Sequence, residues 1–308
     1  MNLKIYIIIL FLFFTTEIKT HANIKIKYKI NDQIITNIDI LNEVKYLSFL
    51  RPSLKNLKKN EIIQISKNSL IRETIKKKEL SKIFKNLNDD DLLRNIKGNL
   101  IKFTKVKNED ELKNILKKED IDYEKILEKM KYETLWNQLI YKKYNSLVKI
   151  DETILKEELI KKLSSKKKYE YNLSELLFEV ESEENFKNKY AEILEFIKLN
   201  NFKSAILKFS ISKSASNEGE IGWIKETLLS EEINLELKKT NIKSFTKPFK
   251  SPNGYLILRI NEKKEMQTNY NLQKELKDLV RFEKNKQLNQ FSLLFFKKLK
   301  QNTNIDEF

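Results

Sequence analysis

The stretch that decides the fold begins with Tyr169-Glu170-Tyr171-Asn172-Leu173-Ser174-Glu175-Leu176-Leu177-Phe178. Its first half alternates and its second half is mostly apolar, which is typical of a half-buried β-strand. The segments that follow are amphipathic runs at 186–197 and 202–209, a polar loop at 210–218, a helical run at 230–240 and an apolar run at 255–260. This order predicts one unit of strands and short helices between residues 168 and 263.

Glycine and proline concentrate in the same stretch. The chain has four glycines and three prolines, and five of these seven residues lie here: Gly219, Gly222, Pro248, Pro252 and Gly254. Because glycine adopts positive φ without steric cost, its placement in a glycine-poor chain indicates turns or close backbone approaches. The resulting motifs are Gly219-Glu220-Ile221-Gly222-Trp223 and Gly254-Tyr255-Leu256-Ile257-Leu258.

The order strand, two helices, G-x-x-G-W, helix, P-F and G-Y-x-I-L resembles the parvulin-type peptidyl-prolyl isomerase domain. The resemblance implies a small antiparallel sheet with surrounding helices over residues 167–264. Parvulins bind a proline side chain in an apolar pocket beside a polar hydrogen-bonding network. That network lowers the barrier to rotation about the prolyl amide, which is about 20 kcal/mol without a catalyst.

The resemblance also assigns the site positions. The positions of the two family histidines fall on Glu175 and Leu256. The family's acidic or cysteine position, in the loop before the two glycines of G-x-x-G-W, falls on Ser212. These three residues are degenerate catalytic positions. The apolar pocket positions fall on Ile221 and Ile233. The predicted substrate-binding residues are Ile221, Ile233 and Trp223.

Both family histidines are therefore replaced. An ionised Glu175 only accepts hydrogen bonds, so it cannot reproduce the donor and acceptor pair of a neutral imidazole, and Leu256 offers no hydrogen bond. We expect the domain to keep its fold and apolar pocket and to lose most of the rate enhancement. The alternative is an active prolyl isomerase in which Glu175 and Ser212 replace the usual network.

The first 22 residues read as a secretory signal peptide. Lys4 supplies the positive start, residues 5–14 form an apolar core, and Thr20-His21-Ala22 places small residues where signal peptidase cleaves. The alternative is an uncleaved membrane anchor, but ten apolar residues fall short of the roughly 20 that span a bilayer. We therefore expect cleavage after Ala22, no stable membrane anchor afterwards and a periplasmic location.

The residue inventory excludes several kinds of chemistry. The chain has no cysteine, and its one histidine, His21, lies in the predicted signal peptide. This excludes a Cys–His dyad, a Ser-His-Asp triad and a Cys/His zinc site. The carboxylate cluster at 89–91 is better explained as a helix N-terminal cap than as a metal site. We expect no cofactor and no metal.

The net charge of +16 raises the question of nucleic-acid binding. Lysine, asparagine and isoleucine are overused along the whole chain, and the lysines are interleaved with glutamates rather than gathered in a stripe. The lysine runs at 76–78 and 166–168 are therefore interpreted as solvated faces. Together with the predicted export, this argues against a nucleic-acid partner.

The N-terminal segment, residues 23–166, is predicted to be mainly helical. It opens with an alternating strand at 24–30, a turn, a short return and a capping box from Thr36 to Asp39 that starts a helix. Helices are then expected at about 60–86, from Asp89 to near Gly98, at 109–117 and at 122–148. Trp136 is expected in the core rather than on a client-contacting surface. This opening resembles the SurA family of periplasmic chaperones.

The C-terminal segment, residues 265–308, follows a predicted linker at 264–269. A helix is expected at 272–301, and Ile305 is expected to pair beside the first strand and cover its edge. An element this apolar must be buried, and we expect the chain's own N-terminal domain to cover it, with dimerisation as the alternative. SurA-like chaperones likewise complete their N-terminal domain with a C-terminal helix and strand.

The prediction for the whole chain is an α+β protein with a helical domain built from both ends and one parvulin-like domain. The resemblance implies a periplasmic chaperone that holds unfolded or extended polypeptides, in particular outer-membrane β-barrel precursors. The physical basis would be exposed apolar grooves that bind extended segments reversibly. A structural or adaptor protein without client-holding activity stays open as an alternative.

Overall fold

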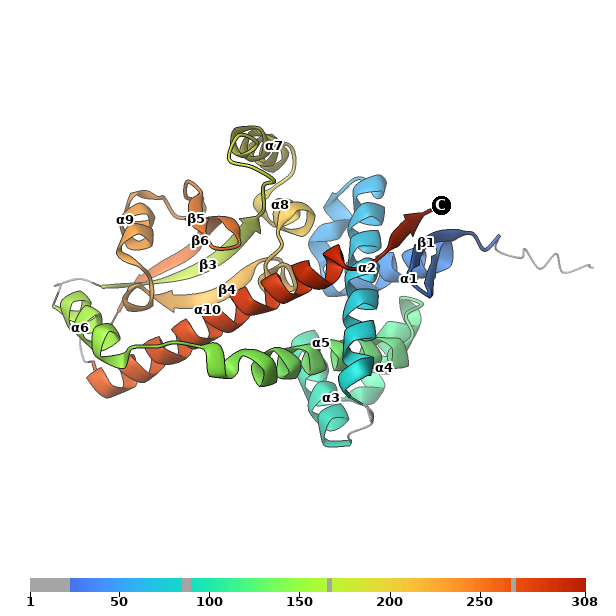
Figure 1. Cartoon of the computed structure of the whole chain (residues 1–308), viewed down its shortest axis with the longest axis horizontal. Coiled ribbons are helices and arrows are strands. Elements are labelled where there is room, and N and C mark those ends of the chain that lie inside the picture. Colours follow the sequence, from blue (N-terminus) through green and yellow to red (C-terminus); the bar gives the residue numbers. More distant parts are fainter. Residues whose placement is uncertain (1–22, 85–89, 165–167, 267–269) are drawn as a thin grey trace, which may run out of the picture.

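Two antiparallel sheets organise the part of the chain that the structure describes, which is residues 23–84, 90–164, 168–266 and 270–308. The structure is a computed structural model, shown in Figure 1. The smaller sheet joins the two ends of the chain, and the larger sheet carries the stretch from 169 to 265. The predicted signal peptide, residues 1–22, lies outside the described residues.

The smaller sheet has the strand order β2-β1-β7. Its strands are β1 (Ile26–Ile30), β2 (Gln33–Thr36) and β7 (Ile305–Glu307). The last strand runs antiparallel to β1 with Ile30 opposite Ile305, and the Tyr28 hydroxyl donates to Glu307 Oε1 at 2.6 Å. This confirms the predicted pairing of Ile305 beside the first strand, although β1 starts at Ile26 rather than at residue 24.

A set of helices follows, which we call the helical frame. Its members are α1 (Asn37–Leu50), η1 (Pro52–Asn56), α2 (Lys59–Ile83), α3 (Asp90–Thr104), α4 (Glu109–Lys118), α5 (Tyr123–Tyr144), η2 (Asn145–Leu147), α6 (Glu152–Leu163) and α10 (Leu272–Gln301). The predicted capping box is present at the start of α1, because the Thr36 hydroxyl accepts from the Asp39 amide and the Asp39 carboxylate accepts from the Thr36 amide.

The predicted end of a helix near Gly98 is wrong, because α3 continues to Thr104. Glycine in a helix interior costs about 1 kcal/mol relative to alanine. Ile96 and Leu100, on either side of Gly98, are buried in a cluster formed with α4 and α5. Burial of side chains of this size contributes about 1.5–3 kcal/mol each, which outweighs the cost of the glycine.

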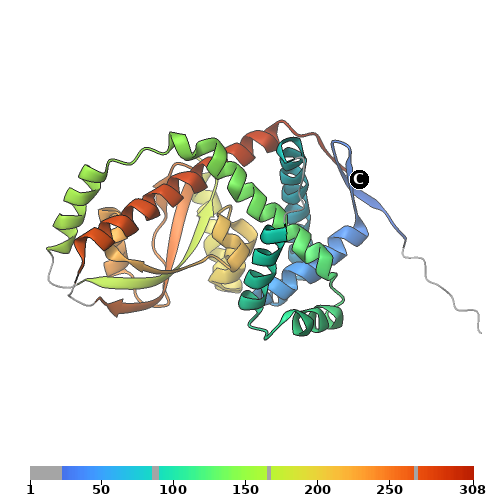
Figure 2. The same cartoon turned by 90° about the horizontal axis from the view of Figure 1, so that it is seen from below.

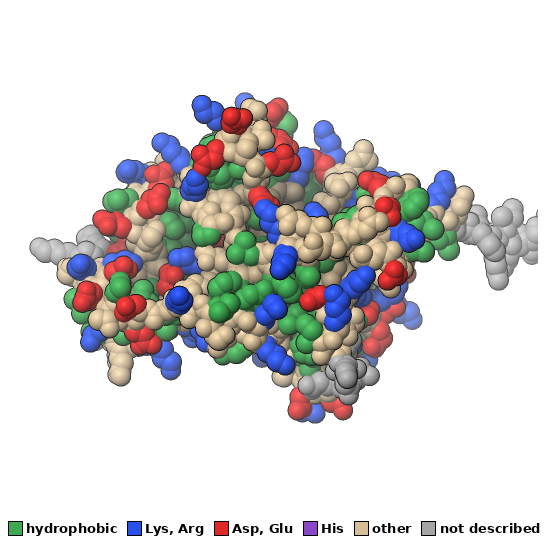
Figure 3. Space-filling view, viewed as in Figure 1, with side chains coloured by type: hydrophobic (Ala, Val, Ile, Leu, Met, Phe, Trp, Pro, Cys, Tyr) green, Lys and Arg blue, Asp and Glu red, His purple; other side chains and the backbone are tan. Residues whose placement is uncertain are grey.

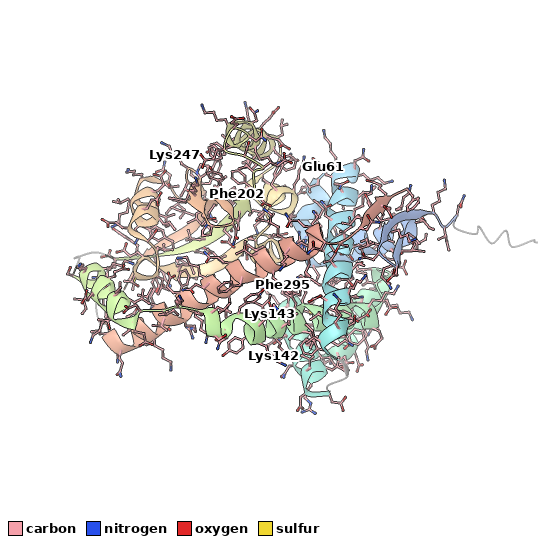
Figure 4. All side chains as sticks on the ribbon, in the orientation of Figure 1. Glu61, Lys142, Lys143, Phe202, Lys247 and Phe295 are labelled. Carbon is pink, nitrogen blue, oxygen red and sulfur yellow. The ribbon has the colours of Figure 1, made fainter. Side chains whose placement is uncertain are left out.

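The C-terminal helix α10 crosses the molecule from the α6 end to the small sheet (Figures 1 and 2). Trp136 of α5 stacks on Phe295 of α10 at 5.5 Å between ring centroids, and its indole N–H donates to Ser292 Oγ at 2.9 Å. Lys143 lies beside the Phe295 ring, with its Nζ 5.4 Å from the centroid of that ring (Figure 4). Trp136 is buried, as predicted, and α10 packs on the N-terminal helices.

The larger sheet has the strand order β4-β3-β6-β5 and is antiparallel throughout. Its strands and associated helices are β3 (Tyr169–Phe178), α7 (Phe186–Leu199), α8 (Phe202–Phe209), η3 (Lys213–Asn217), β4 (Glu220–Lys225), η4 (Glu226–Leu228), α9 (Glu231–Lys239), β5 (Phe249–Ser251) and β6 (Gly254–Glu265). The predicted linker at 264–269 is wrong at its start, because Lys264 and Glu265 extend β6 and pair with β3. Residues 267–269 lie outside the described residues.

The two faces of this sheet pack against different partners. Leu176 and Phe178 of β3 point to the face covered by α7 and α8. The residues that alternate with them, Tyr171 and Leu173, point to the opposite face, where α9 contributes Leu237. This two-residue alternation is the pattern expected for a strand buried on both sides.

The helical frame and the larger sheet share one core. Leu47, Leu54, Leu57 and Ile65 of the frame belong to the same cluster as Leu176, Phe178, Phe202 and Ile206 of the sheet and its helices. At the border of this contact, Lys208 of α8 donates to Glu61 of α2 at 2.9 Å. Figure 4 labels Glu61 on the frame side of the contact and Phe202 on the side of the larger sheet. The predicted division at 166/167 and 264/265 therefore stays an interpretation, because buried contacts cross it.

Candidate functional site

Strands β3 and β6 bring two of the predicted site positions to one face of the sheet. Glu175 points to the same face as Leu173, two residues before it. Its Cα partner on β6 is Leu258, and Leu256 follows two residues away on the same face. Glu175 and Leu256, which occupy the two histidine positions, are therefore neighbours across the β3–β6 pair.

Two glycines allow the chain to approach β3 closely at this place. Gly219 has φ +77°, and a Cβ there would lie 2.6 Å from the Glu175 carbonyl oxygen. Gly254 has φ +130°, and a Cβ there would lie 2.2 Å from the Phe178 carbonyl oxygen. Any other residue would be strained at both positions, so the glycines that mark the two motifs are required by backbone geometry.

A chain of hydroxyl groups leads away from Glu175. Ser214 Oγ donates to Glu175 Oε1 at 2.7 Å, Ser212 Oγ lies 2.7 Å from Ser214 Oγ, and Ser210 Oγ lies 3.0 Å from Ser212 Oγ. Ser210 Oγ accepts from the Leu177 amide at 3.1 Å, which ties the end of the chain to β3. We call Ser210, Ser212, Ser214 and Glu175 the serine chain.

Burial raises the pKa of Glu175 above its ordinary value, and hydrogen bonds from Ser214 and Ser212 only partly offset this effect. A protonated Glu175 can donate a hydrogen bond, whereas the ionised form can only accept. Each hydroxyl in the serine chain both donates and accepts, so the direction of the chain can follow the protonation state of Glu175. The arrangement is therefore a polar network of one carboxyl group and three hydroxyls.

The apolar part of the site lies on the same face. Ile221, Ile233 and Leu256 are partly buried against one cluster. The buried members of that cluster are Tyr171, Leu173, Leu229, Leu237, Phe249, Leu258 and Ile260. Ile221 occupies a bulge in β4, since Gly222 pairs with Leu173 and Glu220 pairs with Ser174. The structure therefore brings Ile221, Ile233 and Leu256 together, and their role in binding a substrate stays a prediction.

Trp223 does not join these residues. Its Cα partner is Asn172, which points to the other face of the sheet, whereas the next residue, Ile224, packs in the apolar cluster. Trp223 is 40 % exposed, and Lys264 Nζ lies 4.2 Å from the centroid of its ring. The predicted contribution of Trp223 to the same apolar site is not supported by this placement.

The sequence interpretation missed two residues of the serine chain, Ser210 and Ser214. The parvulin resemblance assigns only one position of this loop, Ser212. Serine occupies every second position in Ser210-Ile211-Ser212-Lys213-Ser214-Ala215-Ser216, but such alternation places hydroxyls on one side only in an extended segment. Lys213–Asn217 form the 3₁₀ helix η3 and Ser216 Oγ donates to the Lys213 carbonyl oxygen, so the alternation alone does not identify the members of the serine chain.

A separate groove of about 1130 Å³ lies between β2, α1, α2, α4 and α5 of the helical frame. Its lining includes Glu43, whose Oε2 lies 2.7 Å from Lys129 Nζ, and Lys129 also pairs with Glu73. Burial lowers the pKa of Lys129, but the two carboxylates outweigh it and the net pKa lies above the ordinary value. The walls thus mix charges of both signs with apolar residues such as Ile126.

Two features are absent from the described ranges. No group of three or more histidine, cysteine, aspartate or glutamate residues there is placed to hold a metal ion. Within the same ranges, no helix combines the length and hydropathy of a membrane span.

The family model of the PPIC-type PPIase domain, called rotamase, matches residues 171–262. This range covers the larger sheet almost completely, so the sheet and its helices are a parvulin-type domain, and the chain as a whole is an α+β protein with one such domain. A search of curated proteins found no match.

Several solved structures are similar to the chain. A PpiC-type peptidyl-prolyl isomerase domain is 23 % identical over 33 % of this chain and 96 % of its own, with a TM-score of 0.29. A chain from the structures of PEB4 and Cj1289, two SurA-like chaperones of Campylobacter jejuni, is 15 % identical over 92 % and 98 %, with a TM-score of 0.38. PrsA from Bacillus subtilis is 18 % identical over 89 % and 92 %, with a TM-score of 0.29. These TM-scores are below 0.5, so the parvulin assignment depends on the family-model match.

Proposed function

We propose that the protein is an exported chaperone that holds unfolded or extended polypeptides and has at most weak prolyl isomerase activity. The observation that carries this proposal is the composition of the parvulin-type site. Its sheet face keeps apolar residues at Ile221, Ile233 and Leu256, whereas neither histidine position carries an imidazole. Such a site can still bind an apolar side chain of an extended polypeptide.

The polar half of the site explains why we expect weak catalysis. The Leu256 side chain cannot donate or accept a hydrogen bond, and Glu175 Oε1 already accepts from Ser214. An imidazole pair supplies hydrogen-bond donors and acceptors near neutral pH, and these bonds contribute to lowering the barrier to amide rotation. Losing both imidazoles removes most of that contribution while leaving apolar binding intact.

Two further features fit a polypeptide client. The charge-lined groove in the helical frame has a volume of about 1130 Å³, near the upper end of the range for ligand pockets, and its walls offer charges of both signs to a polypeptide. Hydrophobic side chains also gather over α10 on the face shown in Figure 3, and Leu294 of that helix is half exposed. Exposed apolar surface of this kind is typical of interaction sites.

The client class that we propose is outer-membrane β-barrel precursors, and the location is the periplasm. Export is supported by the signal-peptide pattern of residues 1–22. Alternating strands of a barrel precursor expose apolar and aromatic residues when unfolded. The net charge of +16 would add attraction to acidic segments of such a client.

An aggregation assay tests this proposal. The purified protein without residues 1–22 is added at a stoichiometric dose to a denatured β-barrel protein diluted into buffer, and light scattering is followed. We expect suppression, and we expect Ile221→Asp and Ile233→Asp to weaken it. The matched control is Ile242→Asp, because Ile242 is an exposed isoleucine of the same domain. Unchanged aggregation with the native protein would favour an adaptor without client-holding activity.

A second candidate function, active prolyl isomerisation, is favoured by the serine chain. Its hydroxyls and the raised pKa of Glu175, caused by burial, offer a donor and an acceptor network beside the apolar residues. A protease-coupled assay on a short X-Pro peptide separates the two candidates. Brisk turnover that is lost in Ile221→Ala or Ser212→Ala would replace the holding function by catalysis.

A further inference from the structure

The helical frame contacts the loop that carries the serine chain. Arg51, which ends α1, donates from Nε to the Ser216 carbonyl oxygen at 3.1 Å. The Ser53 amide, in η1, donates to Glu218 Oε1 at 3.2 Å. Both acceptors belong to the segment 213–218, which lies between α8 and β4 of the parvulin-type domain. These bonds therefore join residues more than 160 positions apart in the sequence.

Glu218 receives hydrogen bonds from both sides of this contact. Besides the Ser53 amide, Lys203 of α8 donates to its Oε2 at 3.1 Å. Burial raises the pKa of Glu218, but the bonds from Ser53 and Lys203 outweigh it and hold the net pKa below the ordinary value. Its backbone is left-handed, with φ +51°, which is an uncommon conformation for a residue other than glycine. The surrounding contacts hold Glu218 in this conformation.

The backbone next to Glu218 leads directly to the site. The Gly219 amide donates to the Ser214 carbonyl oxygen at 2.9 Å, and the Glu175 amide donates to the Gly219 carbonyl oxygen at 2.8 Å. Ser214 Oγ donates to the Glu175 carboxylate, so both the backbone and the side chain of Glu175 are bonded to this segment. Any displacement of residues 214–219 would change the hydrogen bonds of Glu175.

We propose that Arg51 and Ser53 of the helical frame are positioning residues for the serine chain, acting through Ser216 and Glu218. The frame, and not the parvulin-type domain alone, then sets the hydrogen bonds and protonation of Glu175. Apolar packing supports the same contact, because Leu54 and Leu57, which follow Ser53, are buried in one cluster with Ala215 of the loop. Movement of the frame is thereby transmitted to the peptide-binding site.

Amide hydrogen exchange of the full chain without residues 1–22 tests the structural part of this inference. We expect Arg51→Met to speed exchange of the segment 213–219 about three- to tenfold, as expected for the loss of one hydrogen bond. Arg51→Lys should restore part of the protection, because a lysine can donate to the same carbonyl oxygen. Glu218→Gln, which removes the carboxylate from this contact, should speed exchange in the same segment.

The matched control is Lys208→Met. Lys208 bonds Glu61 across the same contact but touches no residue of the segment 213–219 in the bonds described above. We expect this variant to leave exchange of that segment unchanged. Equal exchange in Arg51→Met and the native chain, or equal acceleration in Arg51→Met and Lys208→Met, would overturn the positioning role.

The functional part of the inference rests on the proposed peptide binding. The pH dependence of binding to a fluorescent prolyl peptide is compared between the native chain and Arg51→Met. We expect the midpoint of the Glu175-dependent step to shift in Arg51→Met and not in Lys208→Met, and an unshifted midpoint would overturn this part. If the native chain binds no peptide, the proposed function fails, while the exchange experiment still decides whether the frame positions the loop.

Discussion

Because the helical frame and the parvulin-type domain share one core, we expect a single cavity in that core to lower the stability of both parts. Leu54 lies in η1 of the frame, is fully buried, and packs in the cluster that contains Phe178 and Ile206 of the domain. Replacing a buried leucine by alanine costs about 3 kcal/mol, within a usual range of about 2–5 kcal/mol. With an unfolding entropy of about 2.1 cal/mol/K per residue, residues 23–308 give about 0.6 kcal/mol/K, so we expect Leu54→Ala to lower the melting temperature by about 5 °C.

The two tryptophans of the chain report on the two parts separately. Trp136 lies in α5 of the frame and Trp223 in β4 of the domain. Leu54→Ala is therefore introduced into two backgrounds, Trp136→Phe and Trp223→Phe, and thermal unfolding is followed by the fluorescence of the remaining tryptophan. We expect both midpoints to fall by similar amounts.

Leu116→Ala is the matched control, because Leu116 is equally buried but belongs to a cluster formed only within the frame. We expect it to lower the midpoint reported by Trp136 more than the midpoint reported by Trp223. If Leu54→Ala does not lower the unfolding midpoint reported by Trp223, the shared core is refuted, because the cavity would then destabilise only the frame.

Three further outcomes are expected. Gly219→Ala should destabilise the protein by about 1–2 kcal/mol or more, because φ is +77° and the new Cβ would lie 2.6 Å from the Glu175 carbonyl oxygen. Gly98→Ala should stabilise the protein by about 0.5–1 kcal/mol, since a Cβ at that position in α3 would meet nothing within 4 Å. Urea unfolding of both variants measures whether the two changes in stability have opposite signs. Glu175→Gln should gain stability relative to the native chain as the pH rises. Burial raises the folded-state pKa of Glu175, so the native chain loses stability as the pH rises from the unfolded-state pKa to the folded-state pKa and bears the full cost of the buried charge above it. A stability difference that is constant between pH 4 and 8 would contradict this. Truncation after Thr303 should remove β7 together with the bond from Tyr28 to Glu307 and expose the edge of β1; we expect a lower midpoint and more self-association at high concentration, which sedimentation measures.

Local patterns in the sequence were sufficient to predict most of the helices and strands. The helical period of residues 272–301 predicted α10 with its observed bounds, and Thr36 with Asp39 predicted the start of α1. The prediction failed where packing outweighed local preference, as at Gly98 inside α3 and at Lys264 inside β6. In both cases, contacts with distant segments extended an element beyond the point where its own residues favour an end.

The candidate site was predictable in part. Glu175, Ser212 and Leu256 could be placed from the parvulin resemblance, which the two glycine motifs help to carry. The hydrogen bond from Ser214 to Glu175 could not be predicted, since it joins residues that are 39 positions apart and Ser214 lies in a loop with no regular period. The role of Leu54 was equally hidden, because a five-residue 3₁₀ helix is too short to show an amphipathic pattern.

The sequence by itself determined which chemistry is absent and where the backbone must turn. Residues 23–308 contain no histidine and no cysteine, and Gly219 and Gly254 mark the close approaches to β3. Only the tertiary structure decided which hydroxyl meets Glu175, which face Trp223 occupies and which core Leu54 joins. The physical reason is that composition and steric limits are properties of each residue, whereas side-chain direction in a bulged strand and burial between distant segments depend on the whole folded chain.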